Sequence, residues 1–304
     1  MFAPLEGITD EHYRGIISKL YPDWDTQSCD FLRVPNPSPY PLRHIIKHFG
    51  KEIYANPPQK NKTIYQILTS PGAYTKKTVE DIRELGFEWL DLNLGCPSKT
   101  VCRHHGGSFL LSELGELKEI IKTIRANFPH TFTCKIRVGY RDDANFENIL
   151  KLLEDEGVDA IVIHARTRDE LYKGVANWDY VKKAVKTVKV PIIGNGDIWS
   201  VDDINKYYDY TDCHSVMLGR SAMKTPWLAK LYKQKISETP IMRLQEIRAY
   251  YNAIYNTLLA QELPESSIIK RIKAISRYLY DDYDNGDQFK RKVLLSKSFS
   301  EQMT

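Results

Sequence analysis

Short runs of β-branched and aromatic residues recur along the first 235 residues or so of the chain. Each run is followed by a stretch with apolar positions three and four apart, and Gly, Pro, Asn or Asp bounds both kinds of segment. Leu117, Ile120, Ile121 and Ile124 illustrate the helical spacing, since they form one stripe. The pattern predicts strands at residues 2–4, 29–34, 63–68, 89–94, 132–138, 160–164, 190–195 and 215–219.

Alternation of strands and helices favours a parallel sheet, because the chain must return to the same edge after each strand. Runs such as Ile161-Val162-Ile163 suit strands that are covered on both faces. Eight strand and helix units within about 235 residues are typical of a closed (β/α)8 TIM barrel. An open, doubly wound sheet is the alternative.

The strand pattern stops at Pro240, and the remaining segments predict helices at residues 242–262, 266–283 and 288–299. Turn residues separate these helices. We therefore expect two domains: a barrel over residues 1–235 and a small helical domain over residues 236–304.

Composition narrows the class of protein. The 304 residues are 42% hydrophobic and 27% charged, which is typical of globular proteins. Apolar runs are far shorter than a membrane span, and the start of the chain lacks the features of a secretion signal, so a cytoplasmic protein is expected. The 5 cysteines form no C-x-x-C pair, which indicates neither disulfides nor a metal site.

Two cations stand within an apolar strand. Lys135 and Arg137 alternate with Ile136 and therefore share one face of their strand. Because buried cations need partners, they predict an anionic or polar ligand at the barrel mouth. An ion pair with Asp91 is the structural alternative. His164, at the end of the sixth strand, is expected to contact a cofactor.

The loops after the seventh and eighth strands contain Asn195-Gly196-Asp197 and Gly219-Arg220. Barrels often bind a phosphate here, since glycine lets backbone N–H groups approach the ligand and arginine adds a charged contact. Either loop alone would suit a simple tight turn. Together they favour a phosphate site.

Cys96 follows a glycine at the end of the fourth strand and precedes Pro97. An ordinary thiol is mostly protonated near neutral pH and can act as a general acid. The other cysteines, Cys29, Cys102, Cys134 and Cys213, are expected to pack as small apolar residues.

Four segments together resemble the tRNA-dihydrouridine synthases. They begin at Ala3, Asp91, His164 and Gly194, and read APLEGITD, DLNLGCPSK, HART and GNGDI. They occur in this order at the first, fourth, sixth and seventh predicted strands, with Gly219-Arg220 and a helical tail following. The Cys96-Pro97 segment and the tail look most like the bacterial C-type branch, which modifies U16 of the D-loop. His104 and His105 stand where the family often has small residues.

The resemblance implies FMN at the barrel mouth, NADPH as reductant and a tRNA uridine as substrate. Hydride would reach C6 of the uracil from reduced FMN, and Cys96 would give a proton to C5. Carried over by position, the cofactor-binding residues are Pro4, Leu5, Glu6, Gln66, Asn93, Lys135, His164, Asn195, Gly196, Asp197, Gly219 and Arg220. The protein is expected to be a monomer.

A basic helix in the tail predicts a contact with RNA. No acidic residue interrupts its four cations, which are Lys270, Arg271, Lys273 and Arg277. Lys270, Lys273 and Arg277 fall on one face of the helix, where they can meet phosphates. The opposite face carries an apolar stripe of Ile268, Ile272, Ile275 and Leu279. A solvated face, paired with Asp281, Asp282 and Asp284, is the alternative.

Two other functions compete with this interpretation. An FMN barrel that oxidises or reduces a free pyrimidine would have no use for the basic tail. A barrel that binds RNA without redox chemistry would be colourless when purified.

Overall fold

The computed structural model describes residues 1–280 and 286–303. At its centre is a parallel sheet in the order β1-β3-β4-β5-β6-β7-β8, with β2 also paired to β3. Phe2 pairs in parallel with Gln27 and with Leu218, so the two ends of the sheet meet. The α/β class and a TIM-like barrel are confirmed, and the open sheet is excluded because it would leave two edges. The strands are β1 (Gln27–Ser28), β2 (Leu32–Arg33), β3 (Thr63–Leu68), β4 (Trp89–Leu94), β5 (Thr131–Arg137), β6 (Ala160–His164), β7 (Ile192–Asn195) and β8 (Ser215–Met217).

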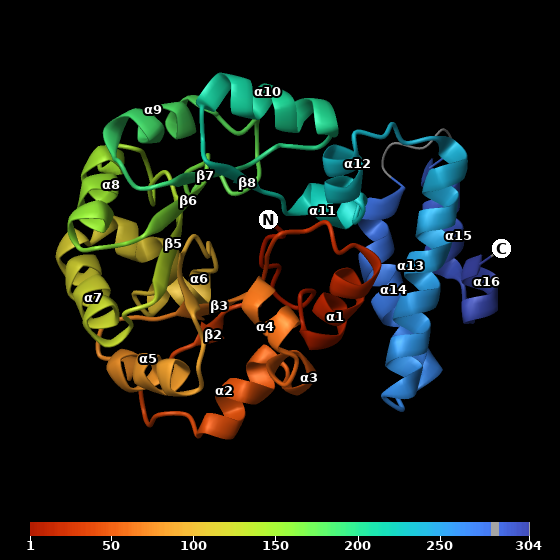
Figure 1. Cartoon of the computed structure of the whole chain (residues 1–304), viewed down its shortest axis with the longest axis horizontal. Coiled ribbons are helices and arrows are strands. Elements are labelled where there is room, and N and C mark those ends of the chain that lie inside the picture. The colour runs from red at the N-terminus through yellow and green to blue at the C-terminus, as the bar shows by residue number, and fades with distance from the viewer. Residues whose placement is uncertain (281–285, 304) are drawn as a thin grey trace.

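Helices α5, α7, α8, α9 and α10 cover the outside of the sheet (Figure 1). In α7 the predicted stripe faces inward, since Leu117, Ile120, Ile121 and Ile124 are all buried. The helices of the first part of the chain are α1 (Glu11–Leu20), α2 (Leu42–Phe49), α3 (Lys51–Tyr54), α4 (Pro57–Lys62), α5 (Thr75–Glu84), α6 (Lys99–Arg103), the 3-10 helix η1 (Gly107–Ser112), α7 (Leu114–Asn127), α8 (Phe146–Asp155), α9 (Asp179–Thr187), α10 (Val201–Thr211), α11 (Arg220–Lys224) and α12 (Leu228–Gln234).

Two predicted strands are wrong in detail. Only Phe2 of the first segment pairs with its neighbours, through isolated bridges. The segment expected at residues 29–34 contains only the short strand β2, and β1 lies just before it. Ser28 lies opposite Ile64 and Leu32 opposite Ile67, so four steps on one side match three on the other. The extra residue is a β-bulge, which sequence periodicity does not reveal.

The C-terminal helices pack on one side of the barrel (Figure 1). Tyr250 of α13 donates a hydrogen bond from its hydroxyl to that of Tyr13 in α1 (2.8 Å). Residues of α13 and α14 belong to the same apolar cluster as the barrel core. These helices are α13 (Pro240–Ala260), α14 (Glu265–Leu279), α15 (Gly286–Leu295) and α16 (Phe299–Met303). The expected boundary at 235/236 falls between α12 and α13.

The last predicted helix is also wrong in detail, because it is divided into α15 and α16. The backbone N–H of Glu301 donates to Ser298 Oγ (3.3 Å), and the Lys297 N–H donates to the Glu301 carboxylate (2.7 Å). A Ser-x-x-Glu sequence that caps a helix N-terminus therefore starts a new helix here. Within residues 1–280 and 286–303, no helix has both the length and the apolar character to cross a bilayer.

Replacing Gly194 with alanine should destabilise the fold by about 2 kcal/mol, because overpacking a rigid core site typically has this effect. A Cβ at Gly194 would lie 2.2 Å from Cε1 of the buried Tyr207 ring. The matched control is Gly115→Ala in α7, where a Cβ meets no atom within 4 Å. Thermal unfolding followed by circular dichroism should show a lowered midpoint only for Gly194→Ala, and equal midpoints would contradict this packing.

Candidate active site

A hollow of about 570 Å³ opens at the carboxyl ends of the strands. Enzymes with this fold carry their working residues at this end. Its wall contains most of the residues expected to hold a cofactor: Pro4, Leu5, Lys135, His164, Asn195, Gly196, Asp197, Gly219 and Arg220. The same wall also contains residues that were not expected, chiefly Tyr172, Trp199 and Ser221.

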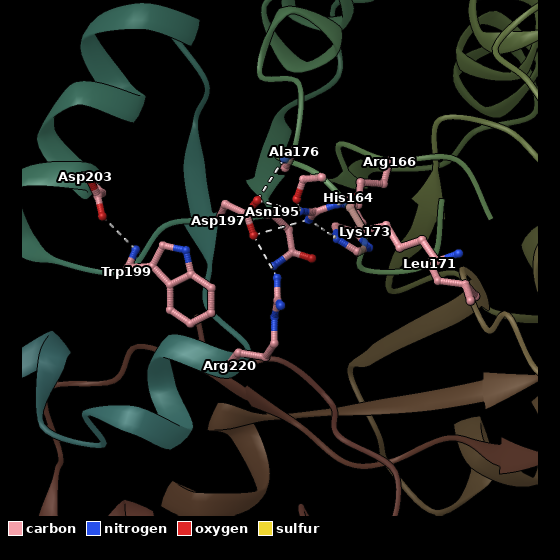
Figure 2. Close-up of polar contacts among 12 residues, drawn as sticks. His164, Arg166, Leu171, Lys173, Ala176, Asn195, Asp197, Trp199, Asp203 and Arg220 are labelled. Carbon is pink, nitrogen blue, oxygen red and sulfur yellow. Dashed lines mark hydrogen bonds and ion pairs between the residues drawn. The ribbon is translucent and has the colours of Figure 1, made fainter. Parts of the chain in front are cut away.

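Asp197 joins two arginines across the wall of the hollow (Figure 2). Its Oδ2 accepts a hydrogen bond from Arg166 Nη2 (2.5 Å), and its Oδ1 accepts one from Arg220 Nη2 (2.7 Å). The N–H of Ala176 donates to the same Oδ2 (2.8 Å). Burial opposes the charge of Asp197, yet Arg166, Ala176 and Arg220 together hold the pKa of this carboxyl below its usual value. Asp197 is therefore ionised, and its carboxylate orients Arg220.

The turn after β7 needs glycine. Gly196 has a φ of +124°, and a Cβ there would lie 2.9 Å from Ala176 Cβ and 3.2 Å from His164 Cδ2. At Gly219 the nearest atom to a Cβ would be Ala3 Cβ at 3.7 Å, an ordinary contact. Packing thus requires glycine at the first position only. At Gly219, crowding within the chain does not explain why the residue is glycine.

His164 is uncharged at neutral pH. Burial, together with the nearby charges of Lys135, Arg137, Arg166 and Arg220, lowers its pKa well below the ordinary value. Its Nε2 lies 3.5 Å from Arg166 Nη1. A neutral imidazole can hydrogen-bond a ligand but is a poor proton donor, which suits the expected contact with a cofactor.

Lys135 of β5 reaches the wall of the hollow. Burial and the neighbouring Arg137 lower the pKa of its amine to about 8. Among the residues that the structure describes, no ion pair within 4 Å joins Lys135 to Asp91. The Asp91 carboxylate instead accepts hydrogen bonds from Thr133 Oγ1 (2.6 Å) and Gln66 Nε2 (2.7 Å). The amine of Lys135 is consequently directed to the hollow.

A chain of hydrogen bonds links Asp91 to the cysteine loop, the loop after β4 that carries Cys96. Gln66 bonds Asp91 on one side and accepts from Asn93 Nδ2 on the other (2.8 Å). Asn93 Oδ1 in turn accepts from the backbone N–H groups of Gly95 (3.0 Å) and Cys96 (2.9 Å). Gln66 and Asn93 lie outside the wall of the hollow, and in this structure they fix the start of the loop after β4.

Cys96 lies beside the hollow, outside its wall. The side chain is 8% exposed and packs with Leu68 and Val101. Burial raises the pKa of the thiol, and the charge of Glu6 adds to the effect. A raised pKa keeps the thiol protonated at neutral pH, as a general acid requires. Glu6 itself is exposed and also lies outside the wall. All 5 cysteines are free thiols and buried.

Two buried arginines hold the loop between β6 and α9. Arg137 donates from Nη1 to two backbone carbonyls of this loop, both at 2.9 Å, and Arg166 donates to two more, at 2.8 and 3.2 Å. The loop carries Tyr172, whose ring centre lies 5.5 Å from Arg137 Cζ and 5.0 Å from Arg220 Cζ. Because Tyr172 remains 56% exposed, the ring is available to a planar ligand.

Sequence reasoning missed the roles of Arg166, Tyr172 and Trp199. Arg166 lies two residues beyond the end of β6, within the HART segment, so its position at the end of a strand indicates a role at the mouth. Tyr172 and Trp199 lie further along their loops, where no periodic pattern applies. Arg220 Cζ lies 4.8 Å from the Trp199 ring centre, a contact between the loops that follow the paired strands β7 and β8.

The basic residues of α14 divide into two sets. Arg271 pairs with Asp10 Oδ2 (2.6 Å) and donates to the Ile8 carbonyl (2.9 Å), so it ties α14 to the barrel. Lys270 and Arg277 are exposed and Lys273 is half-buried, while the predicted apolar stripe is buried. The acidic residues Asp281, Asp282 and Asp284 lie outside the described residues.

Comparisons with known proteins agree on one family. The model of the family described as Dihydrouridine synthase (Dus) matches residues 1–303. The tRNA-dihydrouridine(16) synthase of Shewanella oneidensis is 30% identical over 306 residues, covering 99% of this chain and 95% of the relative. The tRNA-dihydrouridine(16) synthase of Ralstonia nicotianae is 31% identical over 248 residues, covering 79% and 74%. The tRNA-dihydrouridine synthase B of Pasteurella multocida is 30% identical over 253 residues, covering 83% and 74%.

Solved structures share the fold at lower identity. Histamine dehydrogenase from Rhizobium sp. 4-9 has a TM-score of 0.57 at 13% identity, covering 85% of this chain and 48% of that one. A variant of NCR from Zymomonas mobilis has a TM-score of 0.54 at 11% identity, covering 78% and 87%. At these identities the likenesses show the fold alone. The match of the family model to nearly every residue goes further, and by it the chain belongs to the dihydrouridine synthase (Dus) family.

Proposed function

We propose that this protein reduces a uridine of tRNA to 5,6-dihydrouridine, with FMN as cofactor and NADPH as reductant. One observation carries the proposal: a hollow lined by cations and a loop with a buried, protonated cysteine meet at one barrel mouth. Membership of the Dus family supports the reaction. The names of the Shewanella and Ralstonia relatives support U16 as the target.

The residues of the hollow fit FMN. Arg220, oriented by Asp197, offers a charged contact for a phosphate, and the Gly219 turn leaves its backbone open to a ligand. Lys135 and the neutral His164 offer donors to the polar edge of a flavin ring, and Leu5 adds apolar surface.

When bound, reduced FMN supplies a hydride for C6 of the uracil ring. Cys96 donates its thiol proton to C5, and its raised pKa keeps that proton in place until then. Lys135 is a cation in the wall of the hollow, and it stabilises negative charge that builds up on the uracil carbonyls or on the reduced flavin. The exposed ring of Tyr172 offers a surface for the base.

The tRNA must present its uridine turned out of the folded RNA, at a cost of a few kcal/mol. Phosphate contacts offset this cost. We propose residues 236–304 as the RNA-binding domain, with Lys270, Lys273 and Arg277 of α14 facing phosphates. Arg271, held by Asp10, sets the position of that helix relative to the barrel.

Replacing Cys96 with alanine should leave a yellow, FMN-loaded protein that forms dihydrouridine at least about 100-fold more slowly, because a positioned general acid contributes that much. The measurement is dihydrouridine in a tRNA transcript by mass spectrometry, alongside the flavin spectrum. Cys213→Ala, another buried cysteine, is the control and should keep wild-type turnover. Unchanged turnover in Cys96→Ala would remove Cys96 from the mechanism.

Replacing Arg220 with methionine should raise the Kd for FMN about 10- to 100-fold, since hydrogen bonds to charged groups contribute about 1.5–3 kcal/mol. Titration of the flavin-free protein with FMN, followed by flavin fluorescence, measures this. Arg248→Met, at an exposed position of α13, controls for the loss of a cation. Equal Kd values for the two variants would show that Arg220 does not hold the phosphate.

Reversing Lys270, Lys273 and Arg277 to glutamate should weaken tRNA binding and reduce the slope of log Kd against log salt concentration by about one per lost phosphate contact. The control reverses Lys186, Lys189 and Lys206, which are exposed on α9, on α10 and between these helices. Fluorescence anisotropy with labelled tRNA reports both quantities. If the two triple variants bind alike, the face of α14 is an ordinary solvated surface.

A further inference from the structure

Aromatic and cationic side chains from three consecutive loops meet on the rim of the mouth. Phe109 follows β4, Tyr140 follows β5 and Arg168 follows β6. The ring centres of Phe109 and Tyr140 are 5.6 Å apart and the rings stand edge to face. Arg168 Cζ lies 5.2 Å from the centre of the Tyr140 ring, and His105 adds a fourth planar group 4.4 Å from Phe109. None of these residues belongs to the wall of the flavin hollow.

This cluster borders a second hollow, of about 700 Å³. Phe109, Tyr140 and Arg141 form part of its wall, and both rings are half-exposed. Glu113 and Asp142 lie on the same wall. The hollow therefore combines flat apolar rings, an exposed cation and hydrogen-bond acceptors. That is the set of groups that a nucleotide needs: stacking for its base, a cation for its phosphate and acceptors for its N–H edge.

The position of Tyr140 is fixed by its neighbours. The N–H of Arg168 donates to the Gly139 carbonyl (2.9 Å), and the N–H of Asp169 donates to the Tyr140 carbonyl (3.2 Å). A Cβ at Gly139 would lie 1.9 Å from the Asp142 carbonyl oxygen, so only glycine permits this turn. The aromatic surface is thus held in place before any ligand arrives, which lowers the entropy cost of binding.

The second hollow is adjacent to the cysteine loop. Arg168 Nε donates to the carbonyl of Pro97 (3.3 Å), the residue that follows Cys96. The side chain that lies over Tyr140 thereby touches the loop that carries the proposed proton donor. Consecutive nucleotides of an RNA are covalently joined, so the neighbours of a uridine presented to Cys96 must lie close to this rim.

We propose that the hollow beside Phe109, Tyr140 and Arg141 holds a second unpaired nucleotide of the tRNA, directly next to the target uridine. The inference rests on the proposed function. The base lies against the two rings with its N–H edge toward Glu113 and Asp142. Its phosphate lies on the side of Arg141, because the carboxylates repel it. The site would favour binding of a target uridine whose adjacent nucleotide is also unstacked, as in an RNA loop.

The test is a double-mutant cycle on binding. Tyr140→Leu should raise the Kd for tRNA about 10-fold, since stacking of one base on an aromatic ring contributes about 1–3 kcal/mol. The tRNA is then made with an abasic nucleotide on the 5′ or the 3′ side of the target uridine. With one of these two tRNAs, wild-type protein should bind about as weakly as Tyr140→Leu, and the substitution should have no further effect.

Two variants serve as controls. Tyr140→Phe keeps the ring and should bind tRNA like the wild type, whereas Tyr210→Leu removes an exposed ring on α10 and should change nothing. FMN absorbance and the rate of NADPH oxidation should be the same in all variants.

A 10-fold effect of Tyr140→Leu that persists with both abasic tRNAs would overturn the inference, since the ring would then only shape the loop. A changed KM for NADPH in place of a changed Kd for tRNA would overturn it as well. Binding is measured separately from dihydrouridine formation. Coupling without product would therefore contradict the proposed function and leave this subsite standing.

Discussion

The active-site end of the barrel depends on how it accommodates concentrated positive charge. Lys135, Arg137, Arg166 and Arg220 all act on the single imidazole of His164. A buried cation is unfavourable unless carbonyls, carboxylates or a ligand compensate its charge. Here Asp197 bridges two of the arginines, and backbone carbonyls of the β6–α9 loop receive hydrogen bonds from the two that are buried. Among the described residues, the charge of Lys135 has no ion-pair partner within 4 Å, and an anionic or polar ligand in the hollow would compensate it.

The same charges organise the loops that surround the hollow. Arg137 and Arg166, at the ends of β5 and β6, hold one loop by its carbonyl groups, and this loop carries Tyr172 above the mouth, where its ring contacts Arg137 and Arg220. The hydrogen-bond network from Asp91 through Gln66 and Asn93 does the same for the loop that carries Cys96. Structural support and proposed chemistry therefore use the same residues. A substitution at the mouth would be expected to affect both.

The C-terminal helices take their position from the barrel. The contact between Tyr13 and Tyr250 and the ion pair between Asp10 and Arg271 join them to α1 and to the loop before it, and the apolar core is continuous across the junction. Helices α7 and α8, which follow the loops of the proposed nucleotide subsite, lie on the opposite flank of the barrel (Figure 1). An RNA held at both places would span the mouth that lies between them.

The sequence by itself determined the alternation of strands and helices, the bounds of β3, β4 and β6, the buried stripe of α14 and the family. These features depend on periodicity and on residues that are neighbours in the chain. Only the tertiary structure decided that Asp197 faces two arginines, that Gln66 and Asn93 turn toward the cysteine loop, and that Arg271 binds Asp10. Such partners come from segments brought together by the closure and register of the sheet, and a local pattern carries no information about which of them will meet.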